Sequence, residues 1–246
     1  MRLYLLWIGT LFAMANAPAA AAPDWTGFYM LAGARDLAGL KVVTPNLNKT
    51  VVDHLQPWAK LKMETSNGDA DDTGAVCMAA GILRAPGSPF SSAFSVLPSR
   101  DKVIMPYWEI NTSRVRRIYL NRQHPKNLTP TWNGDSIGRW EDDTLVVDTI
   151  GFNDKSWLTG NMAPHTEETH LIERMRQVEA NGNTFIEVVG TVEDRKALTS
   201  AYTYTRYYKK QKIEMDVHAC AEAVIWYKQW RNDALKKEYD RAREVK

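Results

Sequence analysis

The 246-residue chain has few cysteines, little net charge and no long apolar run after its first residues. Its two cysteines, Cys77 and Cys220, show no CxxC or Cys/His spacing, which excludes the common zinc motifs. A formal net charge of +2 gives no electrostatic reason to expect nucleic acid or anionic lipid as a partner. No segment beyond residue 22 approaches 18 apolar residues, and no cysteine follows that segment to carry a lipid. We therefore expect no membrane anchor.

Motifs of several large enzyme classes are also missing. The chain contains no GxSxG, no SxxK and no papain-like cysteine context, so the familiar nucleophilic hydrolases are not indicated. Its glycines are scattered among turns and form neither a phosphate loop nor a dinucleotide fingerprint. We expect an activity that uses no cofactor.

Residues 1–22 are predicted to be a secretory signal peptide. A basic start at Arg2 is followed by an apolar core that is too short to span a membrane and by an alanine-rich end. We expect cleavage between Ala17 and Pro23 and a periplasmic or secreted protein with one domain, residues 23–246. There, Cys77 and Cys220 can form one disulfide across a long loop, worth up to about 5 kcal/mol, with two buried thiols as the alternative.

The middle of the chain is rich in short strand patterns, and the tail is helical. The predicted strands are Phe90–Leu97, Lys102–Ile110, Val115–Asn121, Ser136–Glu141, Thr144–Phe152, Thr169–Glu179, Thr184–Val192, Ala201–Lys209 and Lys212–His218, followed by a helix at Ala221–Val245. Hairpin turns are predicted at Asp142-Asp143 and Asn181-Gly182. These patterns favour a mainly β fold, an antiparallel up-and-down, lipocalin-like barrel or strongly curled sheet. An open sandwich is the competing architecture.

Ionisable side chains occur at positions where these strands otherwise look apolar. Asp148 lies between Val146 and Ile150, and Arg117 and Glu173 occupy similar positions on other strands. A core-facing carboxylate must be paired, hydrogen-bonded or functional. We expect these three charges to meet in a pocket inside the barrel that suits a small, partly aromatic, anionic ligand. The alternative is that Asp148 lies on a solvated face or ties down a loop.

A tyrosine-rich face follows near the end of the strand region. Tyr202, Tyr204, Arg206 and Tyr208 alternate along one strand and therefore share a face. They line the predicted pocket if the face points inward, and they form an outer wall if it points to solvent.

Three histidines are candidates for proton transfer. His165 and His170 flank Thr166–Thr169 at the entrance to a strand, and His124 lies in another loop. Loops at the mouth of a barrel are where catalytic groups usually lie. The five-residue offset of His165 and His170 matches no common zinc spacing, so we expect general acid–base chemistry rather than a metal, with a structural role as the alternative.

The chain resembles a large family of secreted bacterial proteins. Residues 132–153 resemble its pattern W-x-G-x-S-I-G-R-W-E-G-D-T-L-V-V-D-T-x-G-F-N, and Trp157, Pro164-His165 and His170–Arg174 follow as in that family. Matching elements extend over about residues 98–222 and include Arg117–Tyr119, His124-Pro125 and Cys220–Glu222. Asp142 replaces the usual turn glycine and Thr166 replaces serine.

The resemblance implies a cofactor-independent lyase or decarboxylase that acts on lignin-derived, phenylcoumaran-type aromatic dimers, in aromatic compound catabolism. His165, His170 or His124 would move the proton, with Asp148 or Glu173 orienting that base. Substrate-binding candidates are Arg117, which would hold a carboxylate, and Tyr119, Tyr107, Trp140, Asn153 and Trp157. The alternatives are a non-catalytic binding protein for aromatic ligands and a metal-dependent hydrolase using His165, His170 and Asp148. Homo-oligomerisation stays open.

Overall fold

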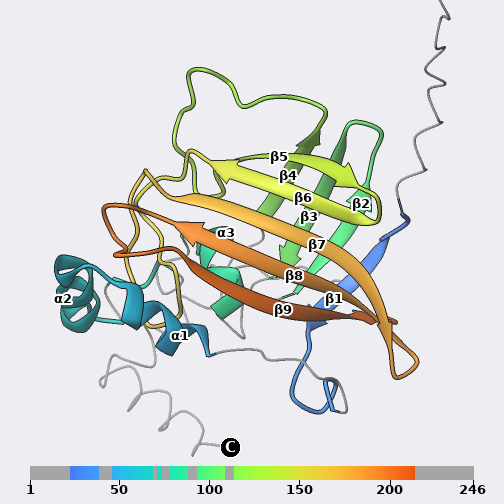
Figure 1. Cartoon of the computed structure of the whole chain (residues 1–246), viewed down its shortest axis with the longest axis horizontal. Helices are drawn as coiled ribbons and strands as arrows, with labels where there is room; N and C mark the ends of the chain where they lie inside the picture. Colours follow the sequence, from blue (N-terminus) through green and yellow to red (C-terminus); the bar gives the residue numbers. More distant parts are fainter. Residues whose placement is uncertain are drawn as a thin grey trace, which may run out of the picture.

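A computed structural model describes residues 23–38, 46–68, 71–73, 78–87, 93–108 and 114–213 of the chain (Figure 1). The predicted leader, the predicted C-terminal helix and both cysteines lie outside the described residues, as does nearly all of the predicted strand Lys212–His218. Within the described ranges, no helix has the length and apolar character needed to cross a bilayer.

Nine strands form a closed barrel, which confirms the predicted architecture. Strand order follows the chain, and the barrel closes where β1 pairs with β9. Its strands are β1 (Gly27–Leu31), β2 (Ala93–Pro98), β3 (Lys102–Trp108), β4 (Arg114–Leu120), β5 (Asp135–Glu141), β6 (Thr144–Ile150), β7 (His170–Ala180), β8 (Asn183–Glu193) and β9 (Tyr202–Gln211).

The barrel is not strictly antiparallel, because β4 and β5 pair in parallel. Parallel neighbours need a crossover that returns the chain to the end from which it came. Residues 121–134 form this crossover, and we refer to them as the crossover loop.

Two turns that the sequence predicted are present. Asp142 has a φ of 54°, and the Asn181-Gly182 pair has φ values of 51° and 68°, as a tight hairpin turn requires. Asp tolerates this left-handed conformation better than most residues, so it can replace glycine at position 142. Strand β1 was not predicted, because its adjacent residues Phe28 and Tyr29 are both buried and break the alternation.

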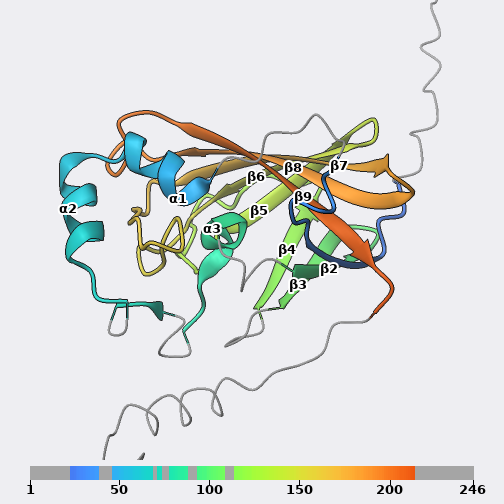
Figure 2. The same ribbon diagram turned by 90° about the horizontal axis from the view of Figure 1, so that it is seen from below.

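Short helices and 3₁₀ turns flank the barrel. They are α1 (Leu47–Thr50), η1 (Val51–His54), α2 (Pro57–Thr65), α3 (Gly81–Arg84) and η3 (Ala85–Gly87). The α1–α2 segment lies at one end of the barrel beside the β8–β9 connection (Figures 1 and 2). There the backbone N–H of Gln56 donates to the Ala197 carbonyl, and the Trp58 indole donates to the Lys196 carbonyl at 2.8 Å.

Aromatic rings fill much of the barrel interior. The ring of Phe94 lies 5.3 Å from that of Tyr107 and 4.7 Å from that of Tyr208. Tyr202, Tyr204, Arg206 and Tyr208 are all buried, which confirms the inward orientation of this face. Such a packed interior stabilises the barrel and leaves less room for a ligand than the sequence suggested.

Gly190 leaves space for one of these rings. A Cβ atom at this position would lie 2.2 Å from Cζ of Tyr204, its cross-strand partner. Glycine therefore allows the tyrosine ring to cover the β8 backbone where a larger residue would clash.

Candidate functional site

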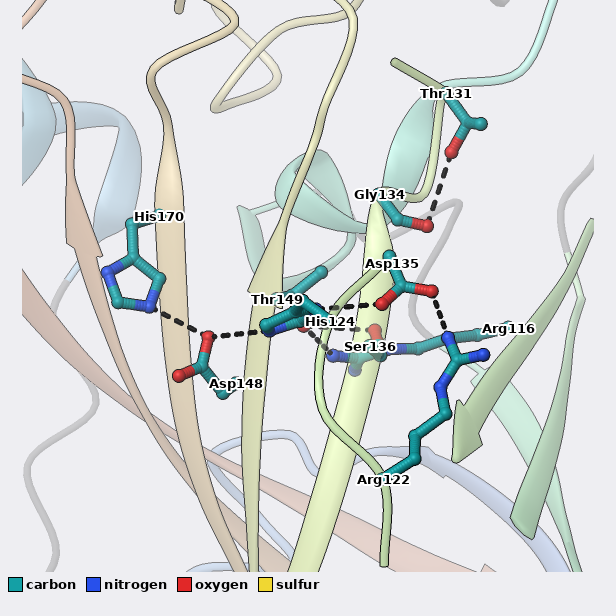
Figure 3. A network of polar contacts seen from close by, with 10 residues as sticks. All are labelled: Arg116, Arg122, His124, Thr131, Gly134, Asp135, Ser136, Asp148, Thr149 and His170. Carbon is teal, nitrogen blue, oxygen red and sulfur yellow. Dashed lines mark hydrogen bonds and ion pairs between the residues drawn. The ribbon is translucent and has the colours of Figure 1, made fainter. Parts of the chain in front are cut away.

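Carboxylates and imidazoles alternate along the outer face of the barrel (Figure 3). Nε2 of His170 lies 2.9 Å from Oδ1 of Asp148, and Nε2 of His124 lies 3.3 Å from the same oxygen. The other ring nitrogen of His124, Nδ1, lies 2.7 Å from Oδ2 of Asp135. Arg122 forms an ion pair with Asp135. We call His124, Asp148 and His170 the relay, because one carboxylate oxygen joins the two rings.

Each member of the relay comes from a different part of the chain. Asp148 is on β6 and His170 begins β7, whereas His124 is in the crossover loop. The parallel pairing of β4 and β5 therefore matters for the site, because it creates the loop that carries His124 to the barrel wall.

The prediction that Asp148 and Arg117 face the barrel interior is wrong. The Asp148 side chain is 37% exposed, and Arg117 is exposed on β4. On β6 the interior positions are Leu145, Val147 and Thr149, which are all fully buried. Asp148 instead lies on a solvent-facing surface and holds a loop histidine, as the alternative interpretation stated.

Apolar residues flank Asp148 on the outer face. In the sheet register its cross-strand partners are Ile137 on β5 and Ile172 on β7, and Tyr119 on β4 pairs with Ile137. The guanidinium of Arg122 lies 3.7 Å from the centre of the Tyr119 ring. This row offers a partly apolar surface, next to the relay, on which an aromatic ring can rest.

The relay can transfer protons because it is both connected and accessible. The side chains of Asp148 and His170 are 37% and 31% exposed, so solvent or a substrate reaches them. A neutral imidazole has one N–H and donates to a single carboxylate, whereas an imidazolium donates to two. His124 lies between Asp135 and Asp148, so gaining or losing a proton changes how many of its hydrogen bonds are satisfied.

Inside the barrel, Glu173 pairs with an arginine that the sequence analysis did not select. Glu173 is buried, as predicted, but it binds Arg116 and not Arg117. Arg116 also donates to Ser136 Oγ at 3.1 Å and to Thr149 Oγ1 at 3.0 Å. The signal was present in the alternation of β4, where Arg116 shares a face with the fully buried Ile118.

The guanidinium of Arg116 is held in its charged form. Burial by itself lowers the pKa of Arg116, but the charge and hydrogen bond of Glu173 outweigh it and raise the pKa above its usual value. The side chains of Arg116 and Glu173 are only 1% and 6% exposed. Without access to substrate, the pair acts on stability rather than on catalysis.

His165 lies apart from the relay in a separate buried network. Its Nε2 is 2.8 Å from Ser156 Oγ, and its Nδ1 is 3.2 Å from both the Thr166 carbonyl oxygen and Thr169 Oγ1. Burial lowers the pKa of His165, so the ring is neutral near pH 7. The structure does not bring His165 into the ligand set proposed for a metal-dependent hydrolase. Within the described ranges, no three His, Cys, Asp or Glu side chains form a cluster able to hold a metal ion.

Among the predicted substrate-binding residues, Tyr119 lies near the relay, because its ring contacts Arg122, which pairs with Asp135. Arg117 lies two residues before Tyr119 on the same face of β4. The others have different surroundings. Tyr107 stacks under Arg114 inside the barrel, Trp140 packs edge-on against Trp25, Asn153 accepts from the Lys155 amide, and Trp157 donates to the Asp71 carbonyl.

Asp135 and Arg122 were missed by the sequence analysis. Nothing in the local sequence marks them, since Asp135 looks like a turn residue and Arg122 like a loop charge.

No protein-family model and no curated protein matches this chain.

Proposed function

We propose that the protein is an exported, cofactor-independent carbon–carbon lyase that acts on a small phenolic substrate at the outer-face relay. The observation that carries this proposal is the shared oxygen of Asp148, which lies within hydrogen-bonding distance of Nε2 of both His170 and His124. A histidine held by a carboxylate in an accessible position is the usual arrangement for a general acid or base. The leader-like pattern of residues 1–22 supports export.

The substrate class comes from the family resemblance and is compatible with the surface around the relay. A phenylcoumaran-type dimer offers an aromatic ring for the Tyr119–Ile137 surface, and Arg117 on the same face supplies a cation for a carboxylate substituent. The binding surface proposed is therefore the outside of the barrel rather than its interior, because Arg116, Glu173 and the tyrosines occupy the interior.

The proposed reaction needs only proton transfers from the protein. Loss of the phenolic proton and opening of the benzylic ether produce a quinone methide, and the departing phenoxide takes up a proton. His170 then removes the proton of the side-chain hydroxyl, the bond to the hydroxymethyl carbon breaks, and formaldehyde leaves. The electron pair of that bond restores the aromatic ring as a phenolate, which is then protonated. Asp148 holds the His170 ring in place for these proton transfers.

The test is formaldehyde release from a phenylcoumaran dimer that carries a free phenol and a hydroxymethyl group. His170→Gln and Asp148→Asn should each lower turnover by about 10²-fold or more, the usual scale for loss of general acid–base catalysis. His54→Gln is the matched control, because His54 forms a 2.9 Å hydrogen bond with Ser200 and is not part of the relay. Its turnover should equal that of the unchanged protein.

Two other outcomes would overturn the proposal in different ways. Turnover that survives both His170→Gln and Asp148→Asn would move the chemistry away from the relay. Tight binding of the dimer with no formaldehyde release would instead show a binding protein for aromatic ligands.

A further inference from the structure

Ser156 and His165 form a hydrogen-bonded pair on the long connection between β6 and β7. Ser156 Oγ and His165 Nε2 are 2.8 Å apart, and both residues are 3% exposed. The proposed lyase reaction uses neither of them. A hydroxyl that is hydrogen-bonded to an imidazole is the basic unit of nucleophilic catalysis, in which the histidine removes the hydroxyl proton.

The surroundings of His165 determine which of its nitrogens carries the proton. Its Nδ1 faces the carbonyl oxygen of Thr166, which can only accept, so Nδ1 must be the donor in the neutral ring. Nε2 is therefore unprotonated and accepts the hydrogen bond from Ser156. This is the tautomer that a general base for Ser156 requires.

A buried carboxylate lies behind this pair. Thr169 Oγ1 lies 3.2 Å from His165 Nδ1 and 2.8 Å from Asp194 Oδ2, so the hydroxyl can accept from the ring and donate to the carboxylate. Burial raises the pKa of Asp194, but hydrogen bonds from Ala197, Thr166 and Thr169 outweigh it and lower the pKa overall. The ionised Asp194 thus stabilises positive charge on His165 through Thr169.

An open groove beside Ser156 is the candidate binding place for a substrate. The groove has a volume of about 440 Å³, and Ser156 is among the residues that line it. Two cations, Lys62 and Lys155, and two anions, Asp71 and Asp154, also line it, so their formal charges cancel. A small uncharged molecule suits such a groove, and the lysines can stabilise negative charge that develops on it.

We propose that Ser156 and His165 form a second reactive site, which transfers the acyl group of a small uncharged ester to Ser156 and then to water. Ser156 Oγ attacks the carbonyl carbon while its proton moves to His165 Nε2. The ester bond to the alcohol breaks, and the alcohol leaves with that proton. Water then attacks the acyl-serine, giving one proton to His165, and the bond to Oγ breaks. Ser156 regains its proton and a carboxylic acid is released.

The direct test is labelling of the full-length protein with a small fluorophosphonate, followed by peptide mapping. The label should be found on Ser156, and labelling at that peptide should be lost in Ser156→Ala. Ser66→Ala is the matched control, since Ser66 lines the same groove but donates to the Lys62 carbonyl and contacts no histidine. It should be labelled at Ser156 as fast as the unchanged protein.

His165→Gln should slow labelling by about 10²-fold, because it removes the base. In the unchanged protein, labelling should slow as the pH falls through the lowered pKa of His165. Hydrolysis of 4-nitrophenyl acetate should be lost in Ser156→Ala and kept in Ser66→Ala. Absence of label on Ser156 in the unchanged protein would overturn the proposal, as would a labelling rate that is independent of both pH and His165. Formaldehyde release is read separately, so this result does not depend on the lyase proposal.

Discussion

Replacing Glu173 by leucine should destabilise the protein strongly, because it leaves the charge of Arg116 buried without its partner. The two side chains are 6% and 1% exposed, so water cannot take over the lost interaction. Breaking a buried pair in this way costs about 3–5 kcal/mol of unfolding free energy. At about 2–4 °C per kcal/mol for a domain of this size, the melting temperature should fall by about 6–20 °C.

A double variant separates the pair interaction from the loss of packing. Arg116→Met combined with Glu173→Leu removes both charges, and such apolar replacements are often close to neutral. Ser136 and Thr149 each lose a hydrogen bond from Arg116, which costs about 1 kcal/mol apiece. The double variant should therefore lose about 2 kcal/mol, less than either single variant.

Urea unfolding followed by tryptophan fluorescence measures the two single variants, Arg116→Met and Glu173→Leu, and the double variant. Glu141→Gln is the control. Glu141 pairs with Arg139 and Arg174 on the exposed outer face, so its loss should leave the unfolding midpoint unchanged within error. A cost below about 1 kcal/mol for Glu173→Leu would refute the reasoning. So would a double variant whose cost equals the sum of the two single costs, because the charges would then be independent.

Three further predictions concern other parts of the molecule. Burial lowers the folded-state pKa of His165, so the unfolding free energy should fall as the pH drops below about 6.5, by at most about 1.4 kcal/mol per pH unit. His165→Gln should reduce that slope, as measured by urea unfolding between about pH 7 and 5. Gly190→Ala should cost about 1–3 kcal/mol through the clash with Tyr204, and clearly less in a Tyr204→Ala background, as measured by thermal melts. Arg117→Ala should change stability by less than about 0.5 kcal/mol but raise the KM for a carboxylated phenolic substrate, whereas an unchanged KM would remove Arg117 from the site.

Most strands could be predicted because one face of each is regularly apolar. Strands β2 to β9 each overlap a predicted segment, and both predicted turns form where Asp142 and Asn181-Gly182 allow positive φ. The parallel pairing of β4 with β5 could not be predicted, since alternation describes a strand but not its neighbour. Strand β1 was missed because its adjacent buried residues Phe28 and Tyr29 break the alternation on which strand prediction depends.

The orientation of Asp148 could not be predicted, because both faces of β6 are apolar. Val147 is fully buried inside the barrel, and Val146 is 5% exposed although it faces outward. The cross-strand partners of Val146 on that face are Arg139 and Arg174, which both bind Glu141. Arginines at such positions can cover an apolar neighbour with their aliphatic stems. A covered outer face looks like a core face in the sequence, so alternation alone assigns no inside to such a strand.

The position of the relay follows from the way the strands are connected. The crossover loop exists because β5 runs parallel to β4, and it passes over the outer ends of β5 and β6, where His124 contacts Asp135 and Asp148. His170 reaches the same oxygen because β7 begins at that end of the barrel, next to the end of β6. The relay is therefore a consequence of the parallel direction of β5 and not of any local motif. A sequence shows the histidines and the carboxylate, but only the crossover joins them.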